Sequence, residues 1–153
     1  MNLKIKAYLS LQKMDVLNNN CFLILVGLPA SGKTIYGLNL AKRNNCLILD
    51  DPQSINDILN FISKENKGII CDPLMCLKSM RDDLIKKSKL KFSNSKKIKF
   101  IYFENNPNKC LINDLKRNKQ ANLDILYFSS LYHIPKNSNV LKIYSKKSHK
   151  NTF

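Results

Sequence analysis

Short apolar runs alternate with amphipathic stretches along most of the chain. The apolar runs predict strands at 21–27, 46–50, 68–72, 98–103 and 139–144. The amphipathic stretches predict helices at 33–43, 54–64, 74–91, 108–119 and 122–133. Regular alternation of strands and helices is typical of a parallel sheet with helices on both faces. We therefore expect an α/β fold, a three-layer α/β/α sandwich with a five-stranded parallel sheet.

The first twenty residues come before the first clear strand. Apolar residues at positions 3, 5, 7 and 9 would suit a short strand, whereas those at 9, 11 and 16 would suit one side of a helix. Both readings stay open. Because 153 residues is an ordinary length for one domain, we expect an N-terminal extension at 1–20 and a single domain at 21–153.

An eight-residue, glycine-rich segment follows the first predicted strand directly. Its sequence is Gly27-Leu28-Pro29-Ala30-Ser31-Gly32-Lys33-Thr34, which matches the phosphate-binding (Walker A) pattern G-x-x-x-x-G-K-[ST] at every fixed position. The strand before it is apolar throughout, as in a strand buried on both faces, and a predicted helix begins within it. The segment thus joins a buried strand to a helix N-terminus, where anions bind.

The loop predicts a site for a nucleotide and Mg²⁺. Backbone N–H groups of such a loop surround a phosphate, and the Lys33 ammonium would reach the β- and γ-phosphates. The Thr34 hydroxyl would ligate Mg²⁺. The candidate nucleotide-binding residues are Gly27, Pro29, Ala30, Ser31, Gly32, Lys33 and Thr34.

Acidic residues end the second and third predicted strands. Asp50 and Asp51 follow the second strand, and a carboxylate there could accept the proton of an attacking hydroxyl. Asp51 precedes Pro52 and could instead begin a turn, with Ser54 capping the next helix, so we favour Asp50 as the base. Asp72 ends the third strand, a position from which a carboxylate can support Mg²⁺ opposite the loop.

The chain carries a net charge of +15, from 26 basic and 11 acidic residues, which attracts phosphate-rich partners. Only three of the basic residues are arginines, and abundant lysine, asparagine and isoleucine are also typical of an A+T-rich coding sequence. The densest basic run contains Lys86, Lys87, Lys89, Lys91, Lys96 and Lys97. This run could bind a nucleic-acid backbone or only solvate a helix end, and charge alone leaves both open.

The five cysteines and two histidines lack the spacing of a structural zinc site. Cysteines at 21, 46 and 71 lie in or beside predicted strands, which suits free thiols in a reducing compartment. No apolar run approaches the ~20 residues that cross a bilayer, and the N-terminus does not resemble a secretory signal. We therefore expect a cytoplasmic location, that of the host cell if the gene is viral, without membrane contact.

The predicted helix at 108–119 is rich in basic residues. Three apolar residues would form its buried stripe: Leu111, Ile112 and Leu115. Arg117 would then face away from that stripe. An arginine there could clamp a transferring phosphoryl group, or it could lie on an ordinary solvated face.

Taken in chain order, these features resemble the kinase domain of phage-type polynucleotide 5′-hydroxyl kinases, in the adenylate-kinase-like group of P-loop NTPases. The matching features are the loop at 27–34, the Asp50-Asp51 pair, Asp72, and Phe103-Glu104-Asn105-Asn106-Pro107 before the basic helix. The resemblance spans about residues 21–144.

The resemblance implies ATP-dependent phosphoryl transfer with Mg²⁺, foremost to the 5′ end of a nucleic acid. By position, Lys33 and Thr34 would hold the phosphates and Mg²⁺. Asp50 would be the base for the acceptor hydroxyl, and Asp72 would support the metal and acceptor site. Arg117 would be the arginine of the lid that covers the nucleotide.

Two other functions stay open. A kinase for a nucleotide or another small hydroxyl compound would need the same loop and acidic residues. A nucleotide-binding protein with little catalysis would fit a lid with one arginine. The resembling family usually carries two or more lid arginines, whereas Asn113 and Asp114 occupy the earlier turn here.

Overall fold

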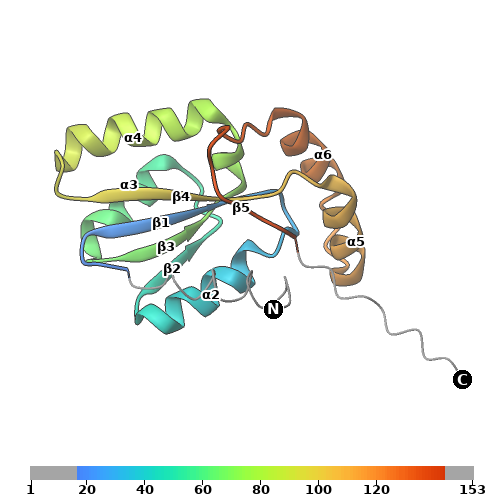
Figure 1. Ribbon diagram of the computed structural model, residues 1–153, viewed down its shortest axis with the longest axis horizontal. Coiled ribbons are helices and arrows are strands. Elements are labelled where there is room, and N and C mark those ends of the chain that lie inside the picture. The colour runs from blue at the N-terminus through green and yellow to red at the C-terminus, as the bar shows by residue number, and fades with distance from the viewer. Residues whose placement is uncertain (1–16, 144–153) are drawn as a thin grey trace, which may run out of the picture.

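The computed structural model describes residues 17–143 as an α/β sandwich (Figure 1). The strands are β1 (Cys21–Val26), β2 (Leu47–Asp50), β3 (Gly68–Cys71), β4 (Lys97–Phe103) and β5 (Val140–Leu141). The helices are α2 (Lys33–Asn44), α3 (Ile55–Lys64), α4 (Lys78–Phe92), α5 (Pro107–Arg117) and α6 (Asn122–Leu131), with a 3₁₀ helix η1 (Pro73–Cys76). All neighbouring strands are parallel, in the order β2-β3-β1-β4-β5. The predicted α/β/α sandwich with a five-stranded parallel sheet is confirmed.

Two predicted segments extend beyond the described residues. The last predicted strand, 139–144, is observed as the short β5, and residue 144 lies outside the described range. Residues 1–16 of the predicted extension also lie outside it. The division into an extension at 1–20 and a domain at 21–153 stays a prediction.

The central strand β1 supplies side chains to both hydrophobic layers, because successive residues of a strand point to opposite faces. Phe22 and Ile24 belong to the cluster that includes side chains of α3 and α4. Leu23 and Leu25 belong to the cluster that includes side chains of α2. Figure 1 shows the corresponding layers, with α2 on one face of the sheet and α3 and α4 on the other.

The predicted helix at 74–91 is two elements in the structure. Asp72 precedes η1, and its side chain accepts a hydrogen bond from the backbone N–H of Leu74. Leu77 then adopts an extended conformation, with φ −78° and ψ 126°, so the helix restarts as α4 at Lys78. The carbonyl of Cys76, at the end of η1, accepts from the Arg81 side chain and from the backbone N–H of His133, so tertiary contacts replace the bond of a continuous helix there. None of the helices within 17–143 is long and apolar enough to cross a membrane.

Helix α5 buries a different face from the one predicted. Ile112 and Leu115, expected in a buried stripe, are 50% and 73% exposed. The buried residues of α5 are Cys110 and Asp114. Asp114 is buried because its Oδ2 accepts a 2.7 Å hydrogen bond from the backbone N–H of Ala121 at the start of α6. A polar contact across the α5–α6 turn therefore sets the orientation of the helix.

Candidate active site

The phosphate-binding loop lies in the middle of the sheet, at the carboxyl ends of the strands. Residues 27–32 connect β1 to α2, and β1 is flanked by β3 and β4. Asp50 ends β2 and Asp72 follows β3, so both carboxylates belong to the same edge of the sheet as the loop. The α5–α6 hairpin follows β4 beyond this edge (Figure 1). Ligands of open parallel sheets bind at this edge.

A tight turn shapes the first half of the loop. The Ser31 N–H donates a 3.2 Å hydrogen bond to the Leu28 carbonyl. Pro29 and Ala30 are the two central residues of this turn, and Ala30 has a left-handed φ of 61°. A turn with positive φ at its third residue ordinarily takes glycine there, because a Cβ disfavours the conformation. Gly32, with φ 91°, then leads into α2.

Gly27 begins the loop where a side chain has no room. A Cβ at this position would lie 2.9 Å from the Phe103 Cβ and 2.9 Å from the Ser31 Oγ. The Ser31 side chain is itself buried, and its Oγ lacks a hydrogen-bond partner among the described residues. Since a buried hydroxyl without a partner is costly, Ser31 suits a loop that receives a polar ligand.

Lys33 is buried at the start of α2, with a side chain turned back over the loop. Its Nζ donates a 3.0 Å hydrogen bond to the Leu28 carbonyl. Burial lowers the pKa of Lys33, an effect that the negative charges of Asp51 and Asp50 oppose. A buried ammonium next to backbone amides is well placed to gain from an incoming phosphate.

Thr34 and Asp50 are joined across the site. The Thr34 Oγ1 lies 3.1 Å from Oδ1 and 3.2 Å from Oδ2 of Asp50, so the hydroxyl donates to the carboxylate. This contact links the N-terminus of α2 to the end of β2. The residue expected to ligate Mg²⁺ and the residue expected to act as base are therefore direct neighbours.

Asp72 and Asp51 add negative charge beside the lysine. The pKa of Asp72 is raised to about 6, mainly by burial and also by the charge of Asp51, whereas the bond from the Leu74 N–H and the charge of Lys33 oppose the rise. Asp51 is exposed and adopts a left-handed φ of 48°, as a turn residue can. The Ser54 side chain accepts a bond from the backbone N–H of Asp57, so the cap expected at Ser54 is confirmed.

Helix α5 contacts the loop through a residue that the sequence did not single out. The side-chain amide of Asn113 donates a 3.1 Å hydrogen bond to the Ala30 carbonyl. Arg117 follows four residues later, so it lies on the same side of the helix, one turn on. Its guanidinium Nη2 lies 3.5 Å from Asp114 Oδ1. The predicted lid arginine thus belongs to a helix that touches the loop.

Two further polar side chains were also missed, the half-buried Tyr132 and the buried Arg81. The Tyr132 hydroxyl lies 2.9 Å from the Val26 carbonyl and 2.7 Å from the Phe103 carbonyl, at the ends of β1 and β4. Burial raises the pKa of Tyr132, so its hydroxyl remains a donor. Arg81 of α4 donates to the carbonyls of Met75 in η1 and His133 after α6. Neither residue belongs to a recognisable motif, and only the fold brings their partners together.

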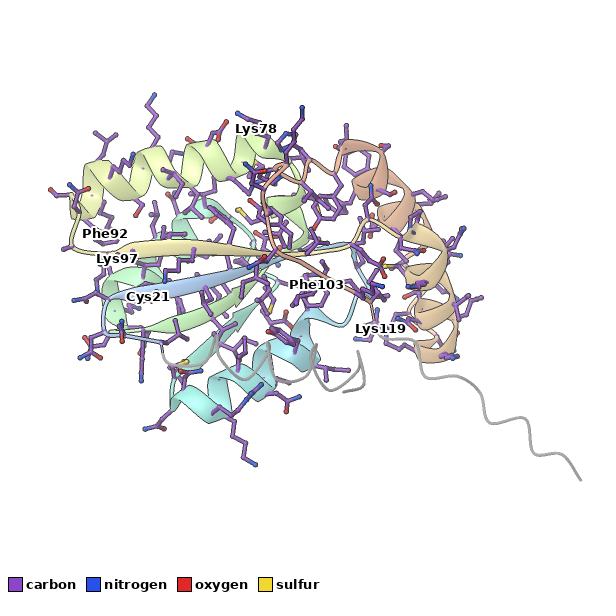
Figure 2. The ribbon with its side chains drawn as sticks, viewed as in Figure 1. Cys21, Lys78, Phe92, Lys97, Phe103 and Lys119 are labelled. Carbon is purple, nitrogen blue, oxygen red and sulfur yellow. The ribbon has the colours of Figure 1, made fainter. Side chains whose placement is uncertain are left out.

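The predicted basic run lies at the opposite end of the sheet. Figure 2 shows Phe92 and Lys97, at the end of α4 and the start of β4, far along the strand from Phe103 at its carboxyl end. Lys89, Lys96 and Lys97 line a shallow hollow of about 290 Å³ there. A nucleic acid bound along this run would therefore lie away from the phosphate-binding loop.

Solved structures with the same arrangement include two proteins of low sequence identity. A crystal structure of a gluconokinase from Sinorhizobium meliloti 1021 is similar with a TM-score of 0.64 and 9% identity, covering 85% of this chain and 86% of that one. The crystal structure of APE1195 is similar with a TM-score of 0.59 and 17% identity, covering 89% of each chain. At such identities these likenesses show the fold alone, a three-layer α/β sandwich of the P-loop NTPase type.

No model of a known protein family matches the chain. A sequence relative is the uncharacterized protein R277 of Acanthamoeba polyphaga mimivirus. The two are 32% identical over 100 residues, which make up 63% of this chain and 72% of R277. The chain therefore belongs to the same protein family as mimivirus R277.

Proposed function

We propose that the protein is an ATP-dependent kinase that transfers the γ-phosphate to an acceptor hydroxyl. The observation that carries this proposal is the contact of Thr34 with Asp50 at the mouth of a complete phosphate-binding loop. A hydroxyl suited to Mg²⁺ and a carboxylate suited to proton transfer stand side by side there. The likeness in fold to a gluconokinase supports the same class of reaction.

ATP binding would rest on the loop and Lys33. The backbone N–H groups of the loop and the start of α2 favour negative charge, and the Lys33 ammonium adds a full positive charge. On binding, Lys33 would exchange its bond to the Leu28 carbonyl for the β- and γ-phosphate oxygens. The unpartnered Ser31 hydroxyl could then find an acceptor on the same ligand.

The residues present fit a magnesium ion that is shared with the nucleotide. Among residues 17–143, no three acidic, histidine or cysteine side chains are grouped to hold a metal by themselves. Mg²⁺ ordinarily needs only one or two protein ligands beside substrate phosphates. The Thr34 hydroxyl and the Asp72 carboxylate would hold it, and the bound ion would neutralise charge on the phosphates.

Asp50 would act as the base. Its carboxylate takes the proton of the acceptor hydroxyl while the acceptor oxygen forms a bond to the γ-phosphorus and the bond to the ADP oxygen breaks. Arg117 would leave its contact with Asp114 and compensate the negative charge of the transferring group. Most of the rate gain in such a site comes from positioning and charge compensation.

For the acceptor we propose the 5′-hydroxyl end of a polynucleotide, on the basis of the motif order from the loop to the basic helix. A small hydroxyl compound is the second candidate. It is favoured by the gluconokinase likeness and by the position of the basic run at the far end of the sheet.

One assay separates these possibilities. The protein is incubated with γ-labelled ATP, Mg²⁺ and a panel of 5′-hydroxyl oligonucleotides, nucleosides, nucleotides and sugar acids, with Lys33→Ala as the blank. Label on oligonucleotides supports the first acceptor, and label on a small compound supports the second. ATP binding without transfer to any acceptor would contradict the kinase proposal and leave a nucleotide-binding protein.

A further inference from the structure

We propose that Asn113 is a positioning residue that holds the phosphate-binding loop and helix α5 together. The inference rests on the proposed nucleotide site, and it adds a residue that none of the motifs contains. Its first support is the 3.1 Å hydrogen bond from the Asn113 side-chain amide to the Ala30 carbonyl. This bond joins parts of the chain that are 83 residues apart. Asn113 is half-buried where it forms.

The second support is the backbone conformation of the residue that receives the bond. Ala30 has a left-handed φ of 61°, at the third position of the turn from Leu28 to Ser31. Glycine adopts this conformation freely, whereas the Cβ of an alanine disfavours it. The alanine therefore needs neighbours to hold the turn. Ser31 contributes its N–H bond to Leu28, and Asn113 contributes the bond to the carbonyl of the same peptide.

The orientation of this peptide bears on phosphate binding. A planar peptide carries its C=O and N–H on opposite sides, so the Ala30 carbonyl cannot turn without moving the Ser31 N–H. With Asn113 as donor, the carbonyl oxygen points to α5. If the peptide rotated, the partial negative charge of that oxygen could face the phosphates and repel them. Asn113 thus favours the loop conformation that accepts an anion.

The same contact sets the position of the lid arginine. Asn113 and Arg117 are one helical turn apart on α5. Between them, the buried Asp114 bonds the Ala121 N–H at 2.7 Å and lies 3.5 Å from Arg117. Asn113 therefore fixes the distance between α5 and the loop. Asp114 holds the α5–α6 turn through Ala121 and orients the guanidinium of Arg117. In this arrangement a single amide serves both the phosphate loop and the arginine beyond it.

The test compares three single variants in the full chain. Asn113→Ala removes the donor, and Asn113→Asp keeps the side-chain shape but places an oxygen against the Ala30 carbonyl. Asn105→Ala is the matched control. Its amide also donates to a backbone carbonyl of the hairpin, that of Ser129 in α6 at 2.9 Å. Two quantities are measured: hydrogen exchange of the Ser31 and Gly32 amides without ligand, and the affinity for Mg²⁺-ATP by calorimetry.

We expect faster exchange of the Ser31 and Gly32 amides in both Asn113 variants and not in Asn105→Ala. The affinity for Mg²⁺-ATP should fall about tenfold in Asn113→Ala and further in Asn113→Asp, as expected for a hydrogen bond to a strained loop. Unchanged exchange and affinity in folded Asn113 variants would overturn the proposal. An equal effect of Asn105→Ala would do the same, because it would reveal only general loss of hairpin stability.

The two proposals can fail separately. If the wild-type protein binds no Mg²⁺-ATP, the proposed kinase function is wrong, and the exchange of the unliganded loop still decides the role of Asn113. If the wild-type protein binds ATP but the Asn113 variants behave like wild type, the kinase function stands and the positioning role is wrong.

Discussion

The Thr34 hydroxyl donates to the carboxylate of Asp50, with distances of 3.1 and 3.2 Å to its two oxygens. This contact connects the N-terminus of α2 to the carboxyl end of β2. It gives the Asp50 carboxylate a fixed orientation beside the phosphate-binding loop. Both acids are exposed, but Asp51, the next residue, has a left-handed φ of 48°, so the two differ in backbone conformation.

The first prediction separates these two acids. Asp50→Asn should reduce phosphoryl transfer by about 10²-fold or more, because an amide cannot accept the proton of the acceptor hydroxyl. ATP affinity should stay nearly unchanged. Asp51→Asn is the matched control, with the same chemical change one residue later. The rate of transfer from labelled ATP is measured in a single turnover for both variants. A larger loss in Asp51→Asn would make Asp51 the base instead of Asp50.

The second prediction concerns stability and pH. Burial raises the pKa of Asp72 to about 6 from its ordinary value of 3.8. Between about pH 4 and pH 6 the folded protein therefore holds a proton that the unfolded chain has released, so the free energy of unfolding falls as pH rises. Asp72→Asn removes this fall while keeping an oxygen for the Leu74 N–H. Above pH 6 the variant should be more stable by roughly 2–3 kcal/mol.

Urea denaturation across this pH range, without Mg²⁺ or nucleotide, measures the effect. Asp82→Asn is the control. The bond from Lys78 lowers the pKa of Asp82, so this carboxylate makes the free energy of unfolding rise with pH instead of fall. If the free energy of unfolding fell equally with pH in wild type and Asp72→Asn, a group other than Asp72 would be responsible.

The third prediction concerns the tyrosine at the ends of β1 and β4. Tyr132→Phe removes the hydroxyl that bonds the Val26 and Phe103 carbonyls. The free energy of unfolding should fall by about 1–2 kcal/mol, because the two strand-end carbonyls lose the one proton that they share. Tyr127→Phe is the control, since Tyr127 is 56% exposed, and it should change stability by less than about 0.5 kcal/mol. Equal stabilities of the two variants in urea would contradict this role for Tyr132.

The fourth prediction tests the basic run at the far end of the sheet. If it binds single-stranded nucleic acid, the logarithm of affinity should fall with the logarithm of salt concentration, by about 0.7 per neutralised phosphate. Replacing Lys86, Lys87, Lys89, Lys91, Lys96 and Lys97 with glutamine should flatten that slope. ATP affinity should not change, because the run lies away from the loop. Fluorescence anisotropy of a labelled oligonucleotide measures the slope, and a flat dependence in wild type would favour a small acceptor.

The fold and the loop could be predicted because local signals agree with tertiary structure there. The apolar strand at 21–26 and the motif at 27–34 depend on burial and backbone geometry that neighbouring residues encode. The helix interruption at Leu77 could not be predicted in this way. There the Cys76 carbonyl accepts from the Arg81 side chain and from the backbone N–H of His133, which is distant in the chain, instead of from a continuing helix.

The lid was the least predictable part of the site. Leu115 suggested a buried stripe, yet Asp114 is buried instead, because it accepts from the N–H of Ala121 just before the next helix. Asn113 carries no sequence signal, since its bond to Ala30 exists only when α5 returns to the loop. Patterns of hydrophobic spacing do not predict such polar contacts between distant segments.

The affinity of Lys33→Ala for Mg²⁺-ATP tests the central claim most directly. The variant removes the buried ammonium that now bonds the Leu28 carbonyl and that would bind the terminal phosphates. Lys42→Ala, in the last turn of the same helix, is the matched control. We predict that calorimetry will give at least about a tenfold weaker affinity for Lys33→Ala than for wild type and Lys42→Ala, equivalent to ~1.4 kcal/mol. Equal affinities in the three folded proteins would contradict the nucleotide site at this loop.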